Sequence, residues 1–203
     1  MDRGLRESIE VLGKKIRTIR SDKAIRLREL SSRTKLSIGA LSQIERGIMT
    51  PSLSSMILIA HALQTPMGDF FDSPELTLKG NPNALCIRKG EETLLHSSKG
   101  VSVYLLYHDE VFSMEIVKNI FEISGTTGDT KYQHEGEEWG MVLKGRLRVE
   151  LGKQAYILNE GDSICLKSNI PHRLINISSG KTIQIWFNSP PLWINKGRSI
   201  FLT

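Results

Sequence analysis

The chain has 203 residues, of which 39% are hydrophobic and 24% are charged, and its formal net charge is +5. This composition is ordinary for a soluble protein, and the length suffices for two domains that each bury a core. No segment approaches the run of roughly 18 apolar residues that a membrane helix needs, so we expect no membrane partner. The two cysteines, Cys86 and Cys165, show no paired spacing. They argue against a disulfide framework or a cysteine zinc site and favour a cytoplasmic protein.

Residues 12–71 have the apolar spacing of a helical bundle. Apolar residues recur every three or four positions in four successive segments, a pattern typical of amphipathic helices. The recurring residues are Leu12, Ile16 and Ile19, then Leu27 and Leu30, then Ile38, Leu41 and Ile44, and finally Leu53, Ile57, Ala60 and Leu63. A short helix over 67–71 would complete a bundle of five helices.

The second and third of these helices form a helix-turn-helix pattern with a polar break over 34–37. Ser37 is a favourable N-cap for the third helix, and Gly47 and Pro51 mark its end. The side of the third helix opposite its apolar stripe carries small or hydrogen-bonding residues, which let the helix backbone come close to the base edges and phosphates of DNA. These residues are Ser37, Gly39, Ser42, Gln43 and Arg46. The pattern therefore predicts a helix that enters the DNA major groove.

Positive charge is concentrated in the same half of the chain. Residues 1–65 carry 12 Lys or Arg and 6 Asp or Glu, whereas residues 66–203 carry 15 and 16. Because cations that neutralise phosphates release counterions, this distribution favours a DNA-binding N-terminal half. A helical bundle that binds another protein is the alternative interpretation of the apolar stripes.

The segment 9–72 resembles the lambda-repressor-like, or XRE, family of helix-turn-helix DNA-binding domains. The resemblance lies in the motifs REL at 28–30, LSQIERG at 41–47 and TPSL at 50–53. It implies that one group of residues faces bases and that another faces phosphates. The first group is Ser37, Ile38, Gly39, Ser42 and Gln43, and the second is Arg28, Arg33 and Arg46.

One further position in this segment matches the family motif, and two positions depart from it. Glu45 resembles the buried or capping acid of the family motif rather than a DNA contact. Arg26 stands where the family has a capping Ser or Thr, and Lys35 stands where the turn has Gly. A turn that needs positive φ at Lys35 would be strained by about 1 kcal/mol.

The pattern changes after Asp72, where the sequence DSPELTLKGNP carries two prolines and no helical stripe. We therefore predict a linker over 73–83. Beyond it, short strand-like runs alternate with glycine and asparagine, which is typical of a β-sandwich or barrel. The predicted strands are 101–107, 116–123, 140–145, 147–151, 154–158, 172–177 and 182–187.

Two clusters in this second half resemble the paired motifs of the cupin family, a double-stranded β-helix that forms a barrel. The first spans 132–138 with Gly145 downstream, and the second is Gly161-Asp162 followed by Pro171-His172 and Asn176. The resemblance implies a cupin sensor domain over 84–190. The family's metal-ligand positions fall on Tyr132, His134, Glu138 and His172.

The first of these positions departs from the metal-binding pattern, because Tyr132 stands where the pattern has His. Two imidazoles and one carboxylate can still bind zinc, nickel, manganese or iron. One interpretation is therefore a divalent metal at His134, Glu138 and His172. The other is a metal-free polar cluster in which the same side chains bind a ligand or one another.

A barrel of this size can enclose one small ligand. The aromatic residues that could form its walls are Tyr132, Trp139, Trp186 and Phe187. Carboxylates that point inward would favour an effector with an amine, such as an amine or amino acid. The candidates for that role are Glu137, Glu138 and Asp162.

The order of the two domains resembles a family of bacterial one-component transcription regulators. Residues 127–145 and the sequence NSPP at 188–191 resemble its putrescine-utilisation repressor branch. The resemblance implies a homodimer that binds a double-stranded DNA operator and responds to a small-molecule effector. Two alternatives are a metal-dependent cupin enzyme fused to a DNA-binding domain, and an antitoxin or DNA-packaging protein whose cupin only dimerises. We expect the regulator and no enzyme.

Overall fold

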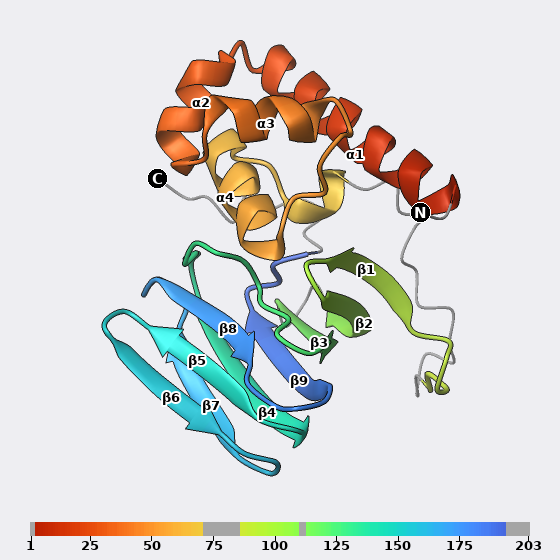
Figure 1. Ribbon diagram of the computed structural model, residues 1–203, viewed down its shortest axis with the longest axis vertical. Coiled ribbons are helices and arrows are strands. Elements are labelled where there is room, and N and C mark those ends of the chain that lie inside the picture. Colours follow the sequence, from red (N-terminus) through yellow and green to blue (C-terminus); the bar gives the residue numbers. More distant parts are fainter. Residues whose placement is uncertain (1–2, 71–85, 110–112, 194–203) are drawn as a thin grey trace.

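The computed structural model describes residues 3–70, 86–109 and 113–193. Within these ranges a helical domain lies against one end of a β domain built from two sheets (Figure 1). The linker predicted over 73–83 lies outside the described residues. None of the described helices is long and apolar enough to cross a membrane.

The helical domain contains α1 (Arg3–Asp22), α2 (Leu27–Thr34), α3 (Ile38–Glu45), α4 (Leu53–Leu63) and the 3-10 helix η1 (Met67–Phe70). The predicted bundle of five helices is therefore wrong in its last member, because four α-helices are described. Four residues give too few backbone hydrogen bonds to sustain an α-helix, so this segment forms one tight turn instead. Met67 and Phe70 are buried and still contribute to the core.

The local signals around the helix-turn-helix are confirmed. The Ser37 side chain caps α3 by accepting a hydrogen bond from the N–H of Ala40 at 3.1 Å. Lys35 has a φ of 61°, so the turn between α2 and α3 does place a non-glycine residue in the left-handed region. Arg26, at the N-cap of α2, makes no capping hydrogen bond with its side chain. Both departures from the family pattern therefore act on α2, at its two ends.

Nine described strands form two antiparallel sheets. They are β1 (Thr93–Ser98), β2 (Val101–Asp109), β3 (Met114–Phe121), β4 (Glu137–Lys144), β5 (Leu147–Leu151), β6 (Gln154–Leu158), β7 (Ser163–Lys167), β8 (His172–Asn176) and β9 (Thr182–Ser189). The larger sheet has the order β1-β2-β3-β9-β4-β7, and the smaller has the order β6-β5-β8. The sequence predicted seven of these strands and missed β1 and β7.

The predicted barrel is not closed along the described strands, which is a correction to the expected fold. The larger sheet ends at β1 and β7, and the smaller ends at β6 and β8. The segment 126–132 pairs with β8 only through the isolated bridges Thr126–Ile175 and Tyr132–His172. Its sequence, TTGDTKY, has turn residues and no apolar alternation, so it forms no regular strand that would extend the smaller sheet.

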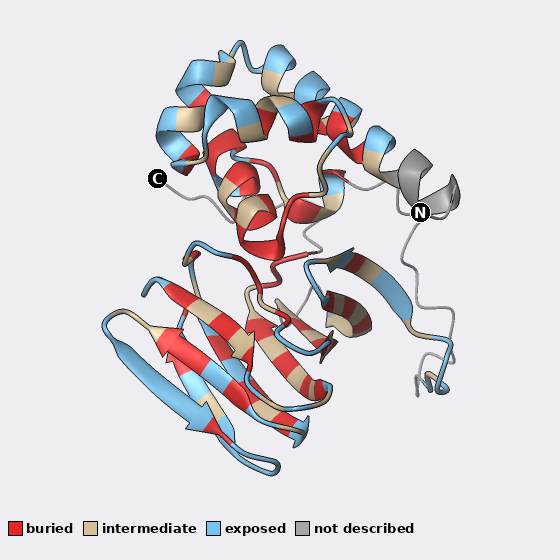
Figure 2. Ribbon diagram, viewed as in Figure 1, coloured by how far each residue is buried: buried red, intermediate tan, exposed pale blue. Residues whose placement is uncertain are grey.

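The larger sheet separates a buried inner face from an outer face. Burial alternates with a period of two along β3 and β9 (Figure 2). Large apolar side chains of the inner face, among them Val117, Phe121 and Trp186, are almost fully buried. The outer face carries the intervening residues of the same strands.

The start of α4 docks onto the β domain. The N–H of Ser54 donates to the carbonyl of Thr127, and the Ser98 hydroxyl donates to the carbonyl of Pro51, both at 2.8 Å. Gly128 lies so close that a Cβ placed there would be 1.8 Å from Oγ of Ser54. Buried apolar side chains of both domains belong to one continuous cluster. The two domains therefore share a core.

Candidate DNA-binding surface and cupin site

The third helix presents the predicted base-facing residues to solvent. Ser37, Ile38, Gly39 and Gln43 are exposed, and Ser42 is half-buried. Ile38 is 47% exposed despite being apolar. An exposed apolar side chain at the start of such a helix can contact the methyl group of thymine.

The three arginines predicted to face phosphates are all exposed. Arg33 also has partners within the protein, because it donates to Glu29 Oε1 at 2.5 Å and to the carbonyl of Ala62 at 3.1 Å. Arg46 donates from Nε to the carbonyl of Ser42 at 3.3 Å. These contacts hold two of the three guanidinium groups at the ends of α2 and α3.

Glu45 is buried, as its resemblance to the family's acidic position implied. It accepts two hydrogen bonds from Arg20, at 2.6 Å from Nε and at 2.8 Å from Nη2. The hydrogen bond with Glu45 raises the pKa of Arg20. This paired contact ties α1 to α3 and so fixes the tilt of the exposed helix. No pattern in the sequence pointed to Arg20, because its partner lies 25 positions away.

The second candidate site is a cluster of His134, Glu138 and His172 at the inner face of the β domain. Glu138 lies on β4 and His172 on β8, while His134 precedes β4 by three residues. Nε2 of His134 lies 2.7 Å from Oε1 of Glu138, and Nε2 of His172 lies 3.1 Å from the same oxygen. All three residues are buried. The fold thus brings together the three residues predicted to bind a metal.

The hydrogen bonds of the two histidines leave one nitrogen of each ring directed at Glu138. Nδ1 of His134 lies 2.9 Å from the carbonyl of Glu135, and Nδ1 of His172 lies 2.8 Å from the carbonyl of Ile170. Because a carbonyl only accepts, each Nδ1 carries the proton and donates it. Each Nε2 therefore presents a lone pair when its ring is neutral, and it donates toward Glu138 when its ring is protonated.

Electrostatics keep Glu138 ionised inside this cluster. Burial alone would raise its pKa, but the close approach and charge of His134 and His172 outweigh burial and hold the pKa well below its usual value. For His134, burial lowers the pKa, but the contact with Glu138 and the Glu138 charge outweigh it, so the net pKa is raised. An anionic oxygen thus faces two imidazole nitrogens in a dry environment, which requires a proton or a cation between them.

The cluster fits a divalent cation. Nε2 of both histidines and Oε1 of Glu138 are buried and make no well-directed hydrogen bond. One potential ligand atom from each residue lies within 4.8 Å of the others. The backbone carbonyls that accept from each Nδ1 orient the rings, as expected for histidine metal ligands. Two nitrogens and one carboxylate form a donor set for zinc, nickel, manganese or iron that leaves open coordination positions.

Tyr132 lies beside this cluster and is also buried. Its ring packs edge-on against His172 with centroids 4.2 Å apart, and it stacks with His134 at 6.2 Å. Burial, together with the charge of Glu138, raises the pKa of the Tyr132 hydroxyl well above its usual value. A neutral phenol is a poor metal ligand, and Tyr132 instead lies beside the cluster with its ring packed against both imidazoles.

Trp186 completes the predicted ligand-binding set. Its indole Nε1 donates to Oε2 of Glu138, which leaves Oε1 to the histidines. Gly140 allows this position, because a Cβ there would lie 1.8 Å from Cζ3 of Trp186. The predicted walls Trp139 and Phe187, by contrast, point away from the site: the register of β4 and β9 puts them on the outer face.

Two predicted acidic residues are also corrected by the fold. Glu137 and Asp162 are exposed, so of the three candidate carboxylates only Glu138 faces inward. Asp162 instead accepts a hydrogen bond from the N–H of Asn159 at 2.8 Å and shapes a turn. The alternation of β4 places Glu137 and Glu138 on opposite faces, a choice that depends on strand register.

A cavity of about 20 Å³ opens beside Glu138. It is lined by Leu53, Val103, Val117, Asn119, Thr127, Tyr132, Glu138, Leu174, Trp186, Asn188, Leu192 and Trp193. This volume holds about one water molecule. Leu53 belongs to the helical domain, so the two domains build the cavity together.

Sequence reasoning missed two amides near this cavity. Asn119 and Gln184 pair across β3 and β9 on the inner face. The Oδ1 atom of Asn119 and both amide atoms of Gln184 are buried without a hydrogen-bond partner. Polar residues that alternate with apolar ones on a strand usually face solvent, so no signal in the sequence marked them as buried.

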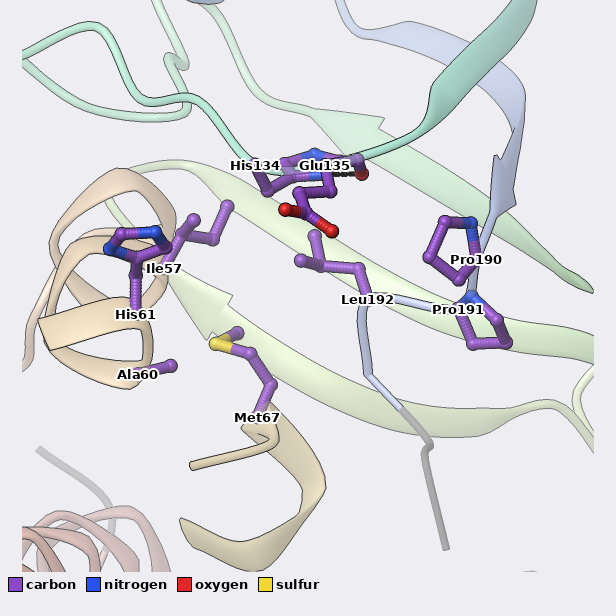
Figure 3. Close-up of a pocket in the computed structure, with 9 residues that line it drawn as sticks. All are labelled: Ile57, Ala60, His61, Met67, His134, Glu135, Pro190, Pro191 and Leu192. Atoms are coloured by element: carbon purple, nitrogen blue, oxygen red, sulfur yellow. Dashed lines mark hydrogen bonds between the residues drawn. The ribbon is translucent and has the colours of Figure 1, made fainter. Parts of the chain in front are cut away.

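A second, smaller cavity of about 10 Å³ lies between the domains, on the His134 side of the cluster (Figure 3). Figure 3 shows Ile57 and His61 of α4 on one side, with His134, Glu135 and Leu192 of the β domain opposite. The metal-ligand candidate His134 therefore borders α4 directly. Helix α4 contributes side chains to both cavities.

Comparisons with known proteins agree with this geometry. The sequence matches a family model described as Helix-turn-helix over residues 16–70 and one described as Cupin domain over residues 120–188. The HTH-type transcriptional regulator PuuR of Escherichia coli (strain K12) is 28% identical over 171 residues, which cover 83% of this chain and 89% of that protein. The transcriptional regulator ClgR of Mycobacterium tuberculosis is 41% identical over 58 residues, 29% of this chain and 52% of that protein.

One solved structure resembles almost the whole chain. It is an HTH_3 family transcriptional regulator from Vibrio cholerae, with a TM-score of 0.66 and 19% identity over 92% of this chain and 99% of that one. At this identity the likeness concerns the fold. Both domain matches fall on the elements described above, and the PuuR match spans both domains. The chain therefore carries one segment that matches the helix-turn-helix family and one that matches the cupin family, and across both it is similar to an HTH-type transcriptional regulator.

Proposed function

We propose that this regulator binds its operator through α3 and that a small-molecule effector in the cupin cavity alters that binding. The observation that carries the proposal is the position of Leu53, a residue of the helical domain that lines the same cavity as Glu138. A cavity of about 20 Å³ holds little more than a water molecule. A larger guest must therefore displace part of the lining, and Leu53 and Leu192 stand on the side that belongs to the domain contact.

The DNA-binding role rests on the exposed surface of α3. Ser37, Ile38, Gly39, Ser42 and Gln43 would read bases, while Arg28, Arg33 and Arg46 would contact phosphates. A homodimer would place two such helices about 34 Å apart, one turn of the duplex, on one face of the operator. The functional units are a DNA-binding domain over 9–72, a linker over 73–83 and a sensor domain over 84–190, in a cytoplasmic protein.

The sensor site would hold a divalent metal on His134, Glu138 and His172. Such an ion supplies a Lewis acid to which a polar group of the effector binds. The residues around it do the remaining work: Trp186 fixes the Glu138 carboxylate, and Tyr132 keeps the imidazoles in place. Oδ1 of Asn119 offers a buried acceptor with no partner, which favours an effector that carries N–H donors, such as an amine or amino acid.

A cupin enzyme is the second candidate, because two histidines and one carboxylate are also the ligand set of non-haem iron oxygenases. The relatives named as regulators favour a non-enzymatic role. Metal analysis of the purified full chain, followed by an oxygen-consumption assay with iron and the candidate amines, separates the two. Stoichiometric iron together with oxygen-dependent turnover would establish the enzyme.

The test of the regulator begins with selection of bound duplexes from a random library by the full chain. The Gln43→Ala variant should lose discrimination at one base position, at a cost of about 1–3 kcal/mol, whereas Arg46→Ala should weaken binding to all duplexes alike. Equal losses on selected and random DNA for Gln43→Ala would contradict the base-reading role.

The effector response is tested by thermal unfolding with zinc, nickel, manganese and iron(II) salts, then with a panel of linear diamines and amino acids. A compound that raises the melting temperature is then added to the DNA-binding assay. Gly128→Ala, which forces the Ser54 contact apart, should change operator affinity and reduce the response to that compound. Gly180→Ala is the matched control, since no atom lies within 4 Å of its added Cβ. A full response in Gly128→Ala would refute coupling through this contact.

A further inference from the structure

We propose that Asn119 and Gln184 form a subsite of the cupin cavity that binds a neutral terminal CONH2 group of the effector, as in a primary carboxamide or a urea. This inference rests on the proposed function, because it takes a small-molecule effector in that cavity as given. It narrows the effectors with N–H donors to those that carry one functional group, in which two N–H donors stand beside a carbonyl acceptor.

The two amides lie next to each other at the wall of the cavity. Asn119 on β3 and Gln184 on β9 are direct cross-strand partners on the inner face of the larger sheet. Such partners have Cβ atoms about 5 Å apart, so the two side chains share one small volume. Asn119 is 7% exposed and Gln184 is 0% exposed. Asn119 lines the cavity of about 20 Å³ beside Glu138, so a guest in this cavity meets the pair.

Three amide atoms of this pair have no hydrogen-bond partner among the residues that the structure describes. They are Oδ1 of Asn119 and both Oε1 and Nε2 of Gln184. Other buried amides of the same domain are bonded: Nδ2 of Asn188 donates to Glu115 at 2.8 Å, and Nδ2 of Asn176 donates to backbone carbonyls. Because buried polar groups are normally paired, the unpaired atoms indicate a place for a bound molecule.

The unpaired atoms define the group that complements them. Oδ1 of Asn119 and Oε1 of Gln184 accept, and Nε2 of Gln184 donates. A terminal CONH2 group has two N–H donors and a carbonyl acceptor, so it can satisfy all three atoms. An ammonium only donates and leaves Nε2 unpaired, whereas a carboxylate only accepts and leaves both oxygens unpaired. A half-turn of the Gln184 amide exchanges its two atoms without changing this set.

The surroundings of the pair favour a neutral group over an ionised one. Val103 is the other ladder partner of Asn119, and Val142 is the other ladder partner of Gln184. His96 follows Val103 in the same row, and burial lowers its pKa to about 4, which keeps it neutral. Among the described residues this row therefore carries no charge. An ammonium or carboxylate buried there without a counter-charge is far less favourable than a buried amide.

The opposite end of the cavity constrains the rest of the effector. The cavity also reaches Glu138, whose ladder partner Asn188 lies four residues beyond Gln184 on β9, about 13 Å along the strand. Val117 and Trp186 line the cavity between these two ends. A molecule that contacts both ends carries a second polar group, separated from its CONH2 by a short apolar stretch. An amino acid with an amide or ureido side chain has this outline.

The test measures thermal unfolding of the full chain with millimolar L-glutamine, L-citrulline, L-glutamate or L-ornithine, without added metal salts. Glutamine and citrulline end in CONH2, whereas glutamate ends in a carboxylate and ornithine in an ammonium on chains of the same length. The first two should raise the melting temperature, and their Kd values should be lower than those of the other two by a factor of about ten or more, because the charged analogues leave buried atoms unpaired.

A variant of Gln184 separates binding from support of the fold. Gln184→Met removes the amide and keeps most of the side-chain volume. The unliganded variant should melt about 2–4 °C above wild type, because it no longer buries unpaired amide atoms, and it should lose the response to glutamine. A lower melting temperature with a retained response would make Gln184 a structural residue and overturn the assignment. If Gln184→Met does not fold, Asn119→Leu provides the same test.

The matched control is Gln154→Met, the same change at an exposed position of β6, which should alter neither quantity. Equal affinities for glutamine, glutamate and ornithine, no binding of either CONH2 compound, or a full glutamine response in Gln184→Met would overturn the subsite. Selective binding of glutamine without any change in operator affinity would contradict the proposed effector response and leave the subsite supported. Operator binding that responds to ornithine and not to glutamine would support the proposed function and overturn the subsite.

Discussion

The inner and outer faces of the larger sheet invert the usual relation between polarity and exposure. The inner face buries Glu115, Asn119, Glu138, Gln184 and Asn188. The outer face holds isoleucines, Phe187 and Trp139 at half-buried or exposed positions. Buried polar groups and exposed apolar groups both reduce stability unless a partner compensates them.

This difference indicates that each face of the larger sheet has a binding partner that the single chain does not provide. Polar groups inside can bind a metal and an effector that the fold alone does not supply. Apolar groups outside can be covered by a second copy. The buried polar residues and the exposed apolar residues lie on the same strands, because successive residues of a strand point to opposite faces. Pairs of adjacent residues therefore make the sharpest tests.

The largest expected effect concerns Glu115, a fully buried carboxylate of the inner face. It accepts hydrogen bonds from Asn188 Nδ2 at 2.8 Å and from the N–H groups of Leu192 and Trp193 at 3.0 Å. Glu115→Ala should lower the free energy of unfolding by about 4 kcal/mol, because it leaves three buried donors unpaired. Urea unfolding measures the loss. Glu137→Ala, an exposed carboxylate on β4, should change it by less than about 0.5 kcal/mol.

The next effect distinguishes the adjacent carboxylates Glu138 and Glu137. Zinc at about 100 times its Kd should raise the free energy of unfolding by about 2.7 kcal/mol, and a chelator should reverse the gain. Glu138→Gln should abolish the gain, whereas Glu137→Gln should retain it. Thermal unfolding with and without zinc measures both. Stabilisation of Glu138→Gln equal to that of wild type would place the metal elsewhere.

The sequence predicted most of this inner site because its residues occur in motifs with fixed spacing. His134 and Glu138 lie within one cupin motif, and His172 lies within the other, so the resemblance alone placed them together. Glu45 was likewise predicted as a buried or capping acid from its place in the helix-turn-helix motif, and it is buried. Its partner Arg20 was not, because the sequence carries no signal for a pairing between two distant helices.

Other features could not be read from the sequence because they depend on register or on the contact between domains. Trp139 and Phe187 were expected to line the cavity, but strand register puts them outside. Leu53 was assigned only to a helical stripe, yet it lines the cupin cavity. A short segment such as 67–71 was expected to be helical from its apolar residues, but its length limits it to a 3-10 turn.

A third prediction uses His96, which the register with Val103 places on the inner face. Burial lowers the pKa of His96 from 6.5 to about 4. In the unfolded chain His96 binds a proton below about pH 6.5, whereas in the folded chain it binds one only below about pH 4. The free energy of unfolding therefore falls as the pH drops from about 6.5 to about 4. Between pH 7 and pH 5 the loss due to His96 should be about 2 kcal/mol.

The loss is measured by urea unfolding of wild type and His96→Leu at both pH values. The difference between the free energies of unfolding of wild type and His96→Leu cancels the titration of the other histidines, which both proteins share. The free-energy difference between the two proteins should shift by about 2 kcal/mol in favour of the variant at pH 5. A constant difference would show that His96 is solvated, and it would weaken the contrast between the two faces.

The smallest effect is expected on the outer face, at Leu143 beside the inner residue Val142. Val142 is fully buried, whereas Leu143 is 45% exposed. Val142→Ser should cost about 3 kcal/mol at any protein concentration, because it leaves a cavity and buries a hydroxyl. Leu143→Ser should cost less than about 0.5 kcal/mol in dilute, monomeric protein.

Concentration decides what the outer residue contributes. If the homodimer forms through the outer face of the larger sheet, the melting temperature of wild type should rise with protein concentration, since association stabilises only the folded form. The rise should be smaller for Leu143→Ser, so the two proteins diverge as concentration increases, while Val142→Ser stays displaced by a similar amount throughout. Differential scanning calorimetry from micromolar to hundreds of micromolar protein measures this divergence. Parallel curves for Leu143→Ser and wild type would mean that Leu143 is ordinary surface, and the dimer contact would then have to exclude the β4 end of the face.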